Sequence, residues 1–344
     1  MGSRIRTSGT SRARVLLIGL CQLLLLSSAR ASTSPPHQWW LDQTYLTGAA
    51  PSFTVDQTGV IHATTYSTLP SPRNTYWRRD DNCHWGAFAF SPGNDPRPQG
   101  FNTSVAMGTD GQPYIAYVGH TTMSVNSSLQ ARIAHYAGTL TNPWTLDSLS
   151  LDAATEHQVN VRVSSSGKLH VTFVGGYYLE YATNVSGSWV TTVFSTTPGV
   201  SAGVDGHALA LDSQGNVHIA YCYRTTTGPS APTHLGYMKY DASTHVWTDT
   251  TLDANNNAGV GPGISIGPDG EPVISYNSLY NLQLMRHSSS GWVSSVVIAG
   301  NGSDSTANCV GSTAICHDSG GRAHVAAYFV AHGQPVMLMA GVIL

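Results

Sequence analysis

The stretch Leu209–Tyr221 reads LALDSQGNVHIAY, and five variants of it recur along the 344-residue chain. Apolar and small residues alternate on both sides of the turn signal D-S-Q-G, which is the pattern of two strands joined by a tight hairpin. The other copies read SFTVDQTGVIHATTY from Ser52, SVAMGTDGQPYIAY from Ser104, VRVSSSGKLHVTF from Val161, ISIGPDGEPVISY from Ile264 and ICHDSGGRAHVAAY from Ile315. The recurrence predicts a repeating β-hairpin unit.

The spacing of the copies indicates a β-propeller. Their turn glycines lie 48 to 56 residues apart, close to the period of propeller blades. The glycines are Gly59, Gly111, Gly167, Gly215, Gly270 and Gly321. A third strand follows each hairpin and in most copies carries Tyr or His, and in five copies a fourth strand opens with tryptophan. The tryptophans are Trp85, Trp144, Trp189, Trp247 and Trp292. We therefore predict an all-β, six-bladed β-propeller of four-stranded blades; a β-sandwich would not explain so regular a period.

The sixth copy lacks a tryptophan strand before the chain ends at Leu344. The missing strand has a match at the other end of the chain, where QWWLDQTYL from Gln38 resembles SGWVSSVVI from Ser290. We predict that this N-terminal strand completes the last blade. Closing the ring in this way would remove the two exposed sheet edges of an open array.

Residues 1–31 have the layout of a secretory signal peptide. Arginines flank the short apolar run Val15–Leu26, and Ala29-Arg30-Ala31 is an A-x-A cleavage site. The apolar run is shorter than the roughly 20 residues that span a bilayer. We therefore expect a protein secreted after cleavage near Ala31, with no membrane span and a single propeller domain over residues 32–344.

Composition narrows the possible partners. Five of the 16 basic residues lie in residues 1–31, whereas all 19 acidic residues follow them. The acidic remainder has no basic stripe for nucleic acid. We expect a monomer without a cofactor, and no metal, because the inner strands hold mainly small residues. Four cysteines follow the signal, and in an oxidising compartment at least one disulfide is expected among them. They are Cys83, Cys222, Cys309 and Cys316.

Equivalent positions of the six copies show which residues the scaffold repeats. A residue that differs from its counterparts is then a candidate for function. Five residues before the turn glycine stand Thr54, Ala106, Arg162, Ala210, Ser265 and Cys316. We expect these side chains to face the crowded axis, where Arg162 is the single large cation. It either fills the channel or pairs with an acid, or it holds an anionic or hydroxylated ligand, because its fixed fork suits carboxylates. Asn160 lies two residues before it.

Histidine also recurs at one position, three residues after the turn glycine, as His62, His170, His218 and His324. A residue repeated around a ring favours an architectural role, because an active site needs asymmetry. We assign the tryptophans and Tyr136, Tyr181 and Tyr240 of the third strands to the core for the same reason.

Irregular residues gather in the loops at the other rim from the hairpin turns. They are His120, Glu156, His157, Tyr177, Tyr178, Asp205, His207, Arg224, His234, Tyr280 and His332, with Arg73 and Arg97 in further loops. Histidine, tyrosine and arginine around a tapered mouth suit sugar binding or acid–base work. Our catalytic candidates are His157, His207 and Tyr178. Our binding candidates are Arg162, Asn160, Arg224, His120 and Asp205.

The LALDSQGNVHIAY repeat with its downstream tryptophan strand resembles those of secreted bacterial propellers grouped with the BNR, or sialidase-like, superfamily. The resemblance covers essentially all of the chain after residue 31 and implies the blade rather than an activity. Sialidases of that superfamily carry S-x-D-x-G-x-T-W boxes and an R-I-P motif, and neither occurs here. Propeller polysaccharide lyases such as the ulvan lyases are similar by analogy: they pair His and Tyr to abstract a proton beside a uronate carboxylate that Arg neutralises.

Two functional hypotheses therefore stay open. The first is a secreted propeller that binds a glycan or another cell-surface ligand, in keeping with the lack of a catalytic signature. The second is a carbohydrate-active enzyme, a polysaccharide lyase above all, in which His and Tyr act while Arg162 or Arg224 holds a uronate. The irregular rim residues do not repeat from blade to blade, which favours the enzyme. A shared fold by itself decides neither hypothesis.

Overall fold

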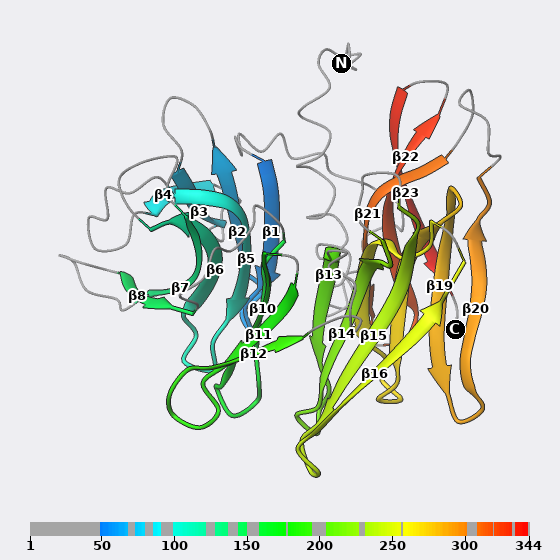
Figure 1. Cartoon of the computed structure of the whole chain (residues 1–344). Coiled ribbons are helices and arrows are strands. Elements are labelled where there is room, and N and C mark those ends of the chain that lie inside the picture. The colour runs from blue at the N-terminus through cyan, green and yellow to red at the C-terminus, as the bar shows by residue number, and fades with distance from the viewer. Residues whose placement is uncertain are drawn as a thin grey trace, which may run out of the picture.

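The computed structural model of the chain is shown in Figure 1. It describes residues 49–67, 73–79, 85–90, 99–121, 128–136, 144–149, 158–176, 178–194, 204–226, 231–255, 257–300, 308–318, 320–331 and 334–342. Throughout these ranges the regular structure is β-strand. The signal peptide, its cleavage site and the N-terminal strand from Gln38 lie outside them, so these three assignments stay predictions.

The strands form six antiparallel sheets, which we call blades one to six in chain order. Blade one contains β1 (Ala49–Val55), β2 (Ile61–Ser67), β3 (Arg73–Arg79) and β4 (Trp85–Phe90). Blade two contains β5 (Gln99–Met107), β6 (Pro113–His120), β7 (Leu129–Tyr136) and β8 (Trp144–Ser148). Blade three contains β9 (Asn160–Val163), β10 (Leu169–Gly175), β11 (Tyr178–Thr183) and β12 (Val190–Phe194). Blade four contains β13 (Val204–Leu211), β14 (Val217–Arg224), β15 (Thr233–Asp241) and β16 (Val246–Asp253). Blade five contains β17 (Val260–Ile266), β18 (Pro272–Ser278), β19 (Asn281–Ser288) and β20 (Gly291–Ile298). Blade six contains β21 (Asn308–His317), β22 (Ala323–Ala331) and β23 (Gln334–Val342).

The prediction of an all-β chain of four-stranded antiparallel sheets is confirmed for blades one to five, and the arrangement is consistent with a β-propeller. Within each of these blades every strand pairs with the next one along the chain. Blade six has three strands in the described part of the chain. The placement of Arg73 in a loop was wrong, because Arg73 is the first residue of β3.

The turn chemistry read from the sequence produces the hairpins. All six turn glycines have a positive φ, between 74° and 88°, which glycine adopts without a steric penalty. In the turn of blade four, the Gly215 N–H donates to the Asp212 carbonyl at 3.2 Å. The Asp212 side chain then accepts the Gln214 N–H at 2.9 Å. Asp and Gly at these two positions therefore specify the turn.

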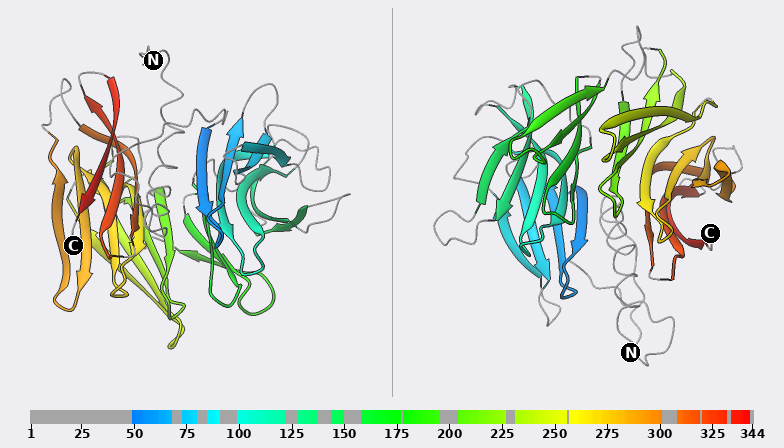
Figure 2. Two further views of the ribbon diagram at one scale, coloured as in Figure 1. Left: turned by 180° about the vertical axis from the view of Figure 1, so that it is seen from behind. Right: turned by 90° about the horizontal axis from the view of Figure 1, so that it is seen from below.

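The core lies between consecutive blades. Ile133 of blade two packs in one cluster with Val161 and Val171 of blade three. Leu209 and Ile219 of blade four belong to a second cluster that reaches back to blade three. The innermost strands lie side by side in the order β1, β5, β9, β13, β17 and β21. Figure 2 shows blades one to three and blades four to six as two adjoining groups.

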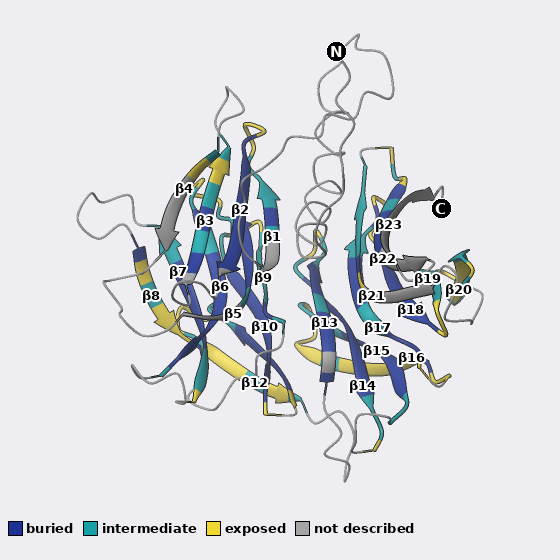
Figure 3. Cartoon of the chain, turned by 90° about the horizontal axis from the view of Figure 1, so that it is seen from above, coloured by how far each residue is buried: buried dark blue, intermediate teal, exposed yellow. Residues whose placement is uncertain are grey.

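Exposure increases from the second strand of a blade to its fourth. β10 and β14 are buried along nearly their whole length, whereas β12 and β16 are largely exposed (Figure 3). The alternation of apolar and polar residues in the fourth strands follows from this position, because only one of their faces packs on a neighbouring blade.

The cysteine prediction is open. Cys222 is buried on β14 and Cys316 is half-buried on β21. Cys83 and the side chain of Cys309 lie outside the described residues, so disulfide bonds stay a prediction.

No described segment forms a helix with the length and apolarity needed to cross a membrane.

Candidate functional site

The repeated histidine of blade four belongs to a buried hydrogen-bonded chain. His218 Nε2 lies 3.2 Å from Asp212 Oδ2, and His218 Nδ1 lies 2.7 Å from the Tyr237 hydroxyl. Asn216 adds two more bonds to the Asp212 carboxylate, at 2.9 Å from its backbone N–H and 2.7 Å from its side chain. This arrangement fits a neutral imidazole that donates to Asp212 and accepts from Tyr237.

Blade one repeats the chain with Asp56, His62 and Tyr76. Burial would raise the pKa of Asp56, but hydrogen bonds from Thr58 and His62 outweigh it and hold the pKa at about 2. The fourth-strand tryptophan of the next blade packs edge-on against the tyrosine, with 5.6 Å between the Tyr76 and Trp144 ring centroids. The hydrogen-bonded Asp56–His62–Tyr76 chain therefore joins the hairpin of blade one to blade two.

Blade three shows what the carboxylate contributes. Ser164 replaces the aspartate, while His170 keeps its bond to the Tyr181 hydroxyl at 2.6 Å. Burial lowers the pKa of His170 to about 4. Burial also lowers the pKa of His218, and the Asp212 carboxylate partly offsets that effect. These contacts confirm that the repeated histidines are architectural.

The tyrosines of the third strands were only partly assigned by the sequence. Tyr181 is buried as predicted, but Tyr136 and Tyr240 are half-buried. The histidine partners in blades one and four are Tyr76 and Tyr237. Tyr76 and Tyr237 were not among the tyrosines assigned from the sequence.

In blade two a tyrosine stands at the position of the repeated histidine, and its contacts are different. Tyr114 replaces the histidine and stacks on His135, with ring centroids 4.2 Å apart. Both side chains bind the Asp110 carboxylate, at 3.2 Å and 3.1 Å. Here the turn begins with Gly108, and the carboxylate comes two residues later than in blades one and four.

Two small residues of the innermost strands, Ser52 and Ser104, join neighbouring blades. Ser52 Oγ accepts the Val105 N–H at 3.1 Å, and Ser104 Oγ accepts the Val161 N–H at 3.1 Å. An innermost strand has one edge without a partner strand, and these hydroxyls satisfy part of that edge. Small side chains are needed there because consecutive innermost strands lie close together.

Arg162 departs from this rule. It lies on β9 opposite His170 and is half-buried. Its Nη1 donates to the Val161 carbonyl at 2.8 Å, and within the described part of the chain no carboxylate forms an ion pair with it. Burial lowers the pKa of its guanidinium. Most of its five N–H donors are therefore available to a ligand.

Two further residues predicted from the sequence, Asn160 and His207, lie near Arg162. Asn160 shares the Arg162 face of β9, and its Nδ2 donates to the His207 carbonyl of β13 at 3.1 Å. His207 is only 1 % exposed, and its backbone N–H donates to Gln158 Oε1 at 3.2 Å. The structure therefore brings together Asn160, Arg162 and His207, which we call the inner-strand cluster.

The other predicted residues are spread along the described part of the rim. Tyr178 begins β11 and is 39 % exposed. His120 ends β6, is buried, and its carbonyl accepts Arg132 Nη2 at 2.9 Å. Arg224 ends β14, and its Nη1 donates to the Ala231 carbonyl at 2.8 Å.

Among the remaining rim residues, Tyr280 is exposed at the β18–β19 turn and His234 is buried at the start of β15. Asp205 lies on β13 with its side chain outside the described part. His157 lies outside the described residues, and so do Glu156, Tyr177, Arg97 and His332.

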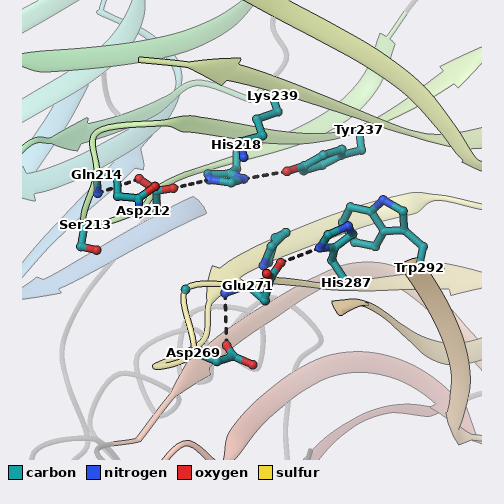
Figure 4. Close-up of a pocket in the computed structure, with 12 residues that line it drawn as sticks. Asp212, Ser213, Gln214, His218, Tyr237, Lys239, Asp269, Glu271, His287 and Trp292 are labelled. Carbon is teal, nitrogen blue, oxygen red and sulfur yellow. Dashed lines mark hydrogen bonds and ion pairs between the residues drawn. The ribbon is translucent and has the colours of Figure 1, made fainter. Parts of the chain in front are cut away.

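A pocket of about 320 Å³ lies between blades four and five, where the sequence analysis placed no site (Figure 4). Its lining residues come from the hairpin turns, second strands and third strands of both blades and from the start of β20. They are Asp212, Ser213, Gln214, His218, Tyr237, Lys239, Asp269, Gly270, Glu271, Pro272, His287 and Trp292. The pocket thus combines acidic, basic and aromatic side chains.

The blade-five wall of this pocket differs from the other turns. Glu271 Oε2 is hydrogen-bonded to His287 Nδ1, and each side chain is more than a third exposed. Asp269 pairs with Arg286 at 3.0 Å. Burial would raise the pKa of Asp269, but the Glu271 N–H and Arg286 lower it.

The signal for this pocket was present in the sequence. The residue after the turn glycine is Val60, Gln112, Lys168, Asn216 or Arg322 in the other blades and is acidic only in blade five.

In the described part of the chain, no group of three or more His, Cys, Asp or Glu side chains is placed to hold a metal ion.

Comparisons with known proteins identify the fold. No protein-family model matches this chain, and no curated protein matches its sequence. An α-L-arabinanase of Penicillium chrysogenum, complexed with arabinobiose, is 14% identical with a TM-score of 0.58 over 85% of this chain and 92% of its own. An α-L-arabinofuranosidase of Fusarium graminearum is 11% identical, with a TM-score of 0.57 over 85% and 92% of the two chains. An ulvan lyase bound to a saccharide is 12% identical, with a TM-score of 0.53 over 84% and 82%. At these identities the likeness concerns the fold alone.

Proposed function

We propose that this chain is an exported carbohydrate-binding β-propeller whose ligand contacts the inner-strand cluster through Arg162. The observation that carries the proposal is that the Arg162 guanidinium forms no ion pair within the described residues, in a position where the five other copies have small side chains. The fork of Arg suits a carboxylate, a sulfate or vicinal hydroxyls. Asn160, two residues before Arg162 on the same strand, adds a polar group beside it.

The structural neighbours support a saccharide ligand at the level of the fold, since they comprise an arabinanase, an arabinofuranosidase and an ulvan lyase. The sialidase-like repeat pattern points in the same direction. The full proposal includes six blades, with residues 38–46 completing blade six. The three strands of that blade leave room in the pattern for one more.

A screen of acidic and neutral polysaccharides immobilised on an array tests the function. We expect binding by the wild-type protein and a loss of about 10- to 100-fold in Arg162→Ala, the worth of a charge-assisted hydrogen bond. The melting temperature should stay nearly unchanged. Arg322→Ala removes an exposed arginine from the turn of blade six and serves as the matched control.

Two results would contradict the binding role of Arg162: undiminished binding by Arg162→Ala, or a large fall of its melting temperature, which would make Arg162 a structural plug. Arg162→Lys keeps the charge but loses the fork, and so separates packing from recognition. The same polysaccharides are incubated in solution and followed by ultraviolet absorbance. Formation of an unsaturated product would establish a lyase, with His157, His207 and Tyr178 as the first candidates for acid–base groups.

A further inference from the structure

We propose that the pocket between blades four and five is a second ligand site and that it binds a neutral sugar. This proposal goes beyond the proposed function, because none of the residues that line the pocket belongs to the inner-strand cluster. At about 320 Å³ it lies at the low end of the range for small-molecule sites, which suits a short saccharide.

One wall of the pocket is rigid. The Asp212 carboxylate accepts four hydrogen bonds, from Gln214, Asn216 and His218, and Tyr237 holds the far side of the imidazole. A carboxylate with four partners has little capacity left for a ligand. This wall therefore gives the pocket its shape, as the hydrogen-bonded row in Figure 4 shows.

The groups available to a ligand lie around it. Glu271 Oε1, the Lys239 ammonium and the Ser213 hydroxyl have no hydrogen-bond partner within the described part of the chain, although all three residues line the pocket. They offer one acceptor, one donor and one group that serves as either. Trp292 adds an apolar surface beside His287, at 5.0 Å between ring centroids.

The mixture of charges selects the class of ligand. An anion would meet the carboxylates of Asp269 and Glu271, and a cation would meet Lys239. A neutral sugar avoids both conflicts, because its hydroxyls can donate to Glu271 and accept from Lys239 while its C–H face lies on an aromatic ring. Buried sugar sites combine a few directed polar groups with apolar surface in this way.

Blade five does not have the hydrogen-bonded Asp–His–Tyr chain that lines the blade-four wall of the pocket. Val273 occupies the histidine position, and Leu284 occupies the position that Tyr237 fills in blade four. The ionisable groups Glu271 and His287 are thus additions that the scaffold does not require. Glu271, like Arg162, is the single residue of its kind at an equivalent position of the six copies.

The two lysines of the chain, Lys168 and Lys239, provide a direct test. Reductive methylation with ¹³C-formaldehyde keeps their charge and gives each a resolved NMR signal, which Lys168→Arg and Lys239→Arg assign. The probes are D-glucose, D-galactose and L-arabinose, with D-glucuronate and D-glucosamine as charged counterparts. We expect at least one neutral sugar to shift the Lys239 signal while Lys168, in the turn of blade three, stays unchanged.

Glu271→Gln should weaken that sugar about tenfold, because it replaces an ionised acceptor by a neutral one of the same shape. Arg162→Ala should leave the Lys239 shift intact, so failure of the proposed function and failure of this site are distinguishable. The proposal is overturned if no neutral sugar moves Lys239 at about 10 mM, a concentration that detects millimolar binding. It is equally overturned if only glucuronate or glucosamine moves it, or if Lys168 moves in parallel.

Discussion

In blade four the turn carboxylate of Asp212 lies beneath His218 with 8 % of its side chain exposed, whereas in blade five the turn carboxylate of Asp269 is 45 % exposed and pairs with Arg286. Asp212 stands three residues before its turn glycine and Asp269 one residue before, but the two hairpins share the turn glycine and the antiparallel pairing. A carboxylate can thus stabilise this hairpin either inside a buried chain or at the surface. Blade five, which lacks the buried chain, supplies Glu271 and His287 to the pocket that it shares with blade four.

The largest expected effect is a loss of stability in blade six, which has three described strands where the other five blades have four. Deletion of residues 38–46 should destabilise the whole domain by about 3–5 kcal/mol, the cost of losing a core tryptophan. Thermal unfolding measures this, and deletion of residues 32–36 is the control. Equal melting temperatures for the two deletions would show that the N-terminal strand does not complete the blade.

The next effect tests whether blade four depends on its histidine. His218→Val copies the residue of blade five, leaves the Tyr237 hydroxyl buried without its acceptor, and should cost about 1–3 kcal/mol. Adding Tyr237→Phe removes that hydroxyl and keeps the ring on Trp292. In urea unfolding the double variant should therefore lose less than the sum of the two single variants. Simple additivity would mean that the chain is not a coupled unit.

The pH dependence compares blade three with blade four. His170 has a folded-state pKa of about 4, below its ordinary 6.5, so the folded state binds fewer protons than the unfolded chain between these values. Stability present above about pH 6.5 is therefore lost as the pH falls toward 4, by about 3 kcal/mol.

Ser164→Asp would give His170 the carboxylate that His218 has. We expect it to raise the pKa of His170 and to reduce the loss of stability between pH 7 and pH 5. Histidine NMR titration and urea unfolding at both pH values measure the two effects. An unchanged His170 pKa would contradict the role assigned to the turn carboxylate.

The smallest effect belongs to the surface pair of blade five. Asp269→Asn should change stability by less than about 1 kcal/mol, because Asp269 and Arg286 are both solvated. Asp212→Asn should cost about 1–3 kcal/mol, since it disturbs four hydrogen bonds, three of them partly buried. Chemical unfolding of both variants gives the ranking, and equal losses would remove the distinction between the two blades.

Most of the scaffold was predictable from local sequence. Each D-x-x-G turn fixes a hairpin by itself, because glycine supplies the positive φ and the aspartate binds the backbone of the turn. Each of the five tryptophans lies within one residue of the start of a fourth strand, and two of them, Trp85 and Trp144, are its first residue. Equivalent positions also separated His218 and its counterparts, which are architectural, from Arg162, which departs from its repeat.

The candidate site was less accessible to this reasoning. Comparison of repeats along one strand found Arg162, but Glu271 was passed over because the hairpin turns were treated as uniform. Its significance depends on His287 and Lys239, which reach the same pocket from β19 and β15. No spacing in the sequence brings those three residues together.

The sequence alone determined the repeating hairpin, the four-strand order of the blades and the set of residues that the scaffold repeats, because turns and strand alternation are set by interactions within a few residues. The tertiary structure decided which side chains meet between blades: serines at free strand edges, tryptophans on tyrosines, and the mixed-charge pocket. These contacts join residues from separate strands and often from different blades. They depend on how neighbouring sheets pack, and no local pattern in the chain encodes that packing.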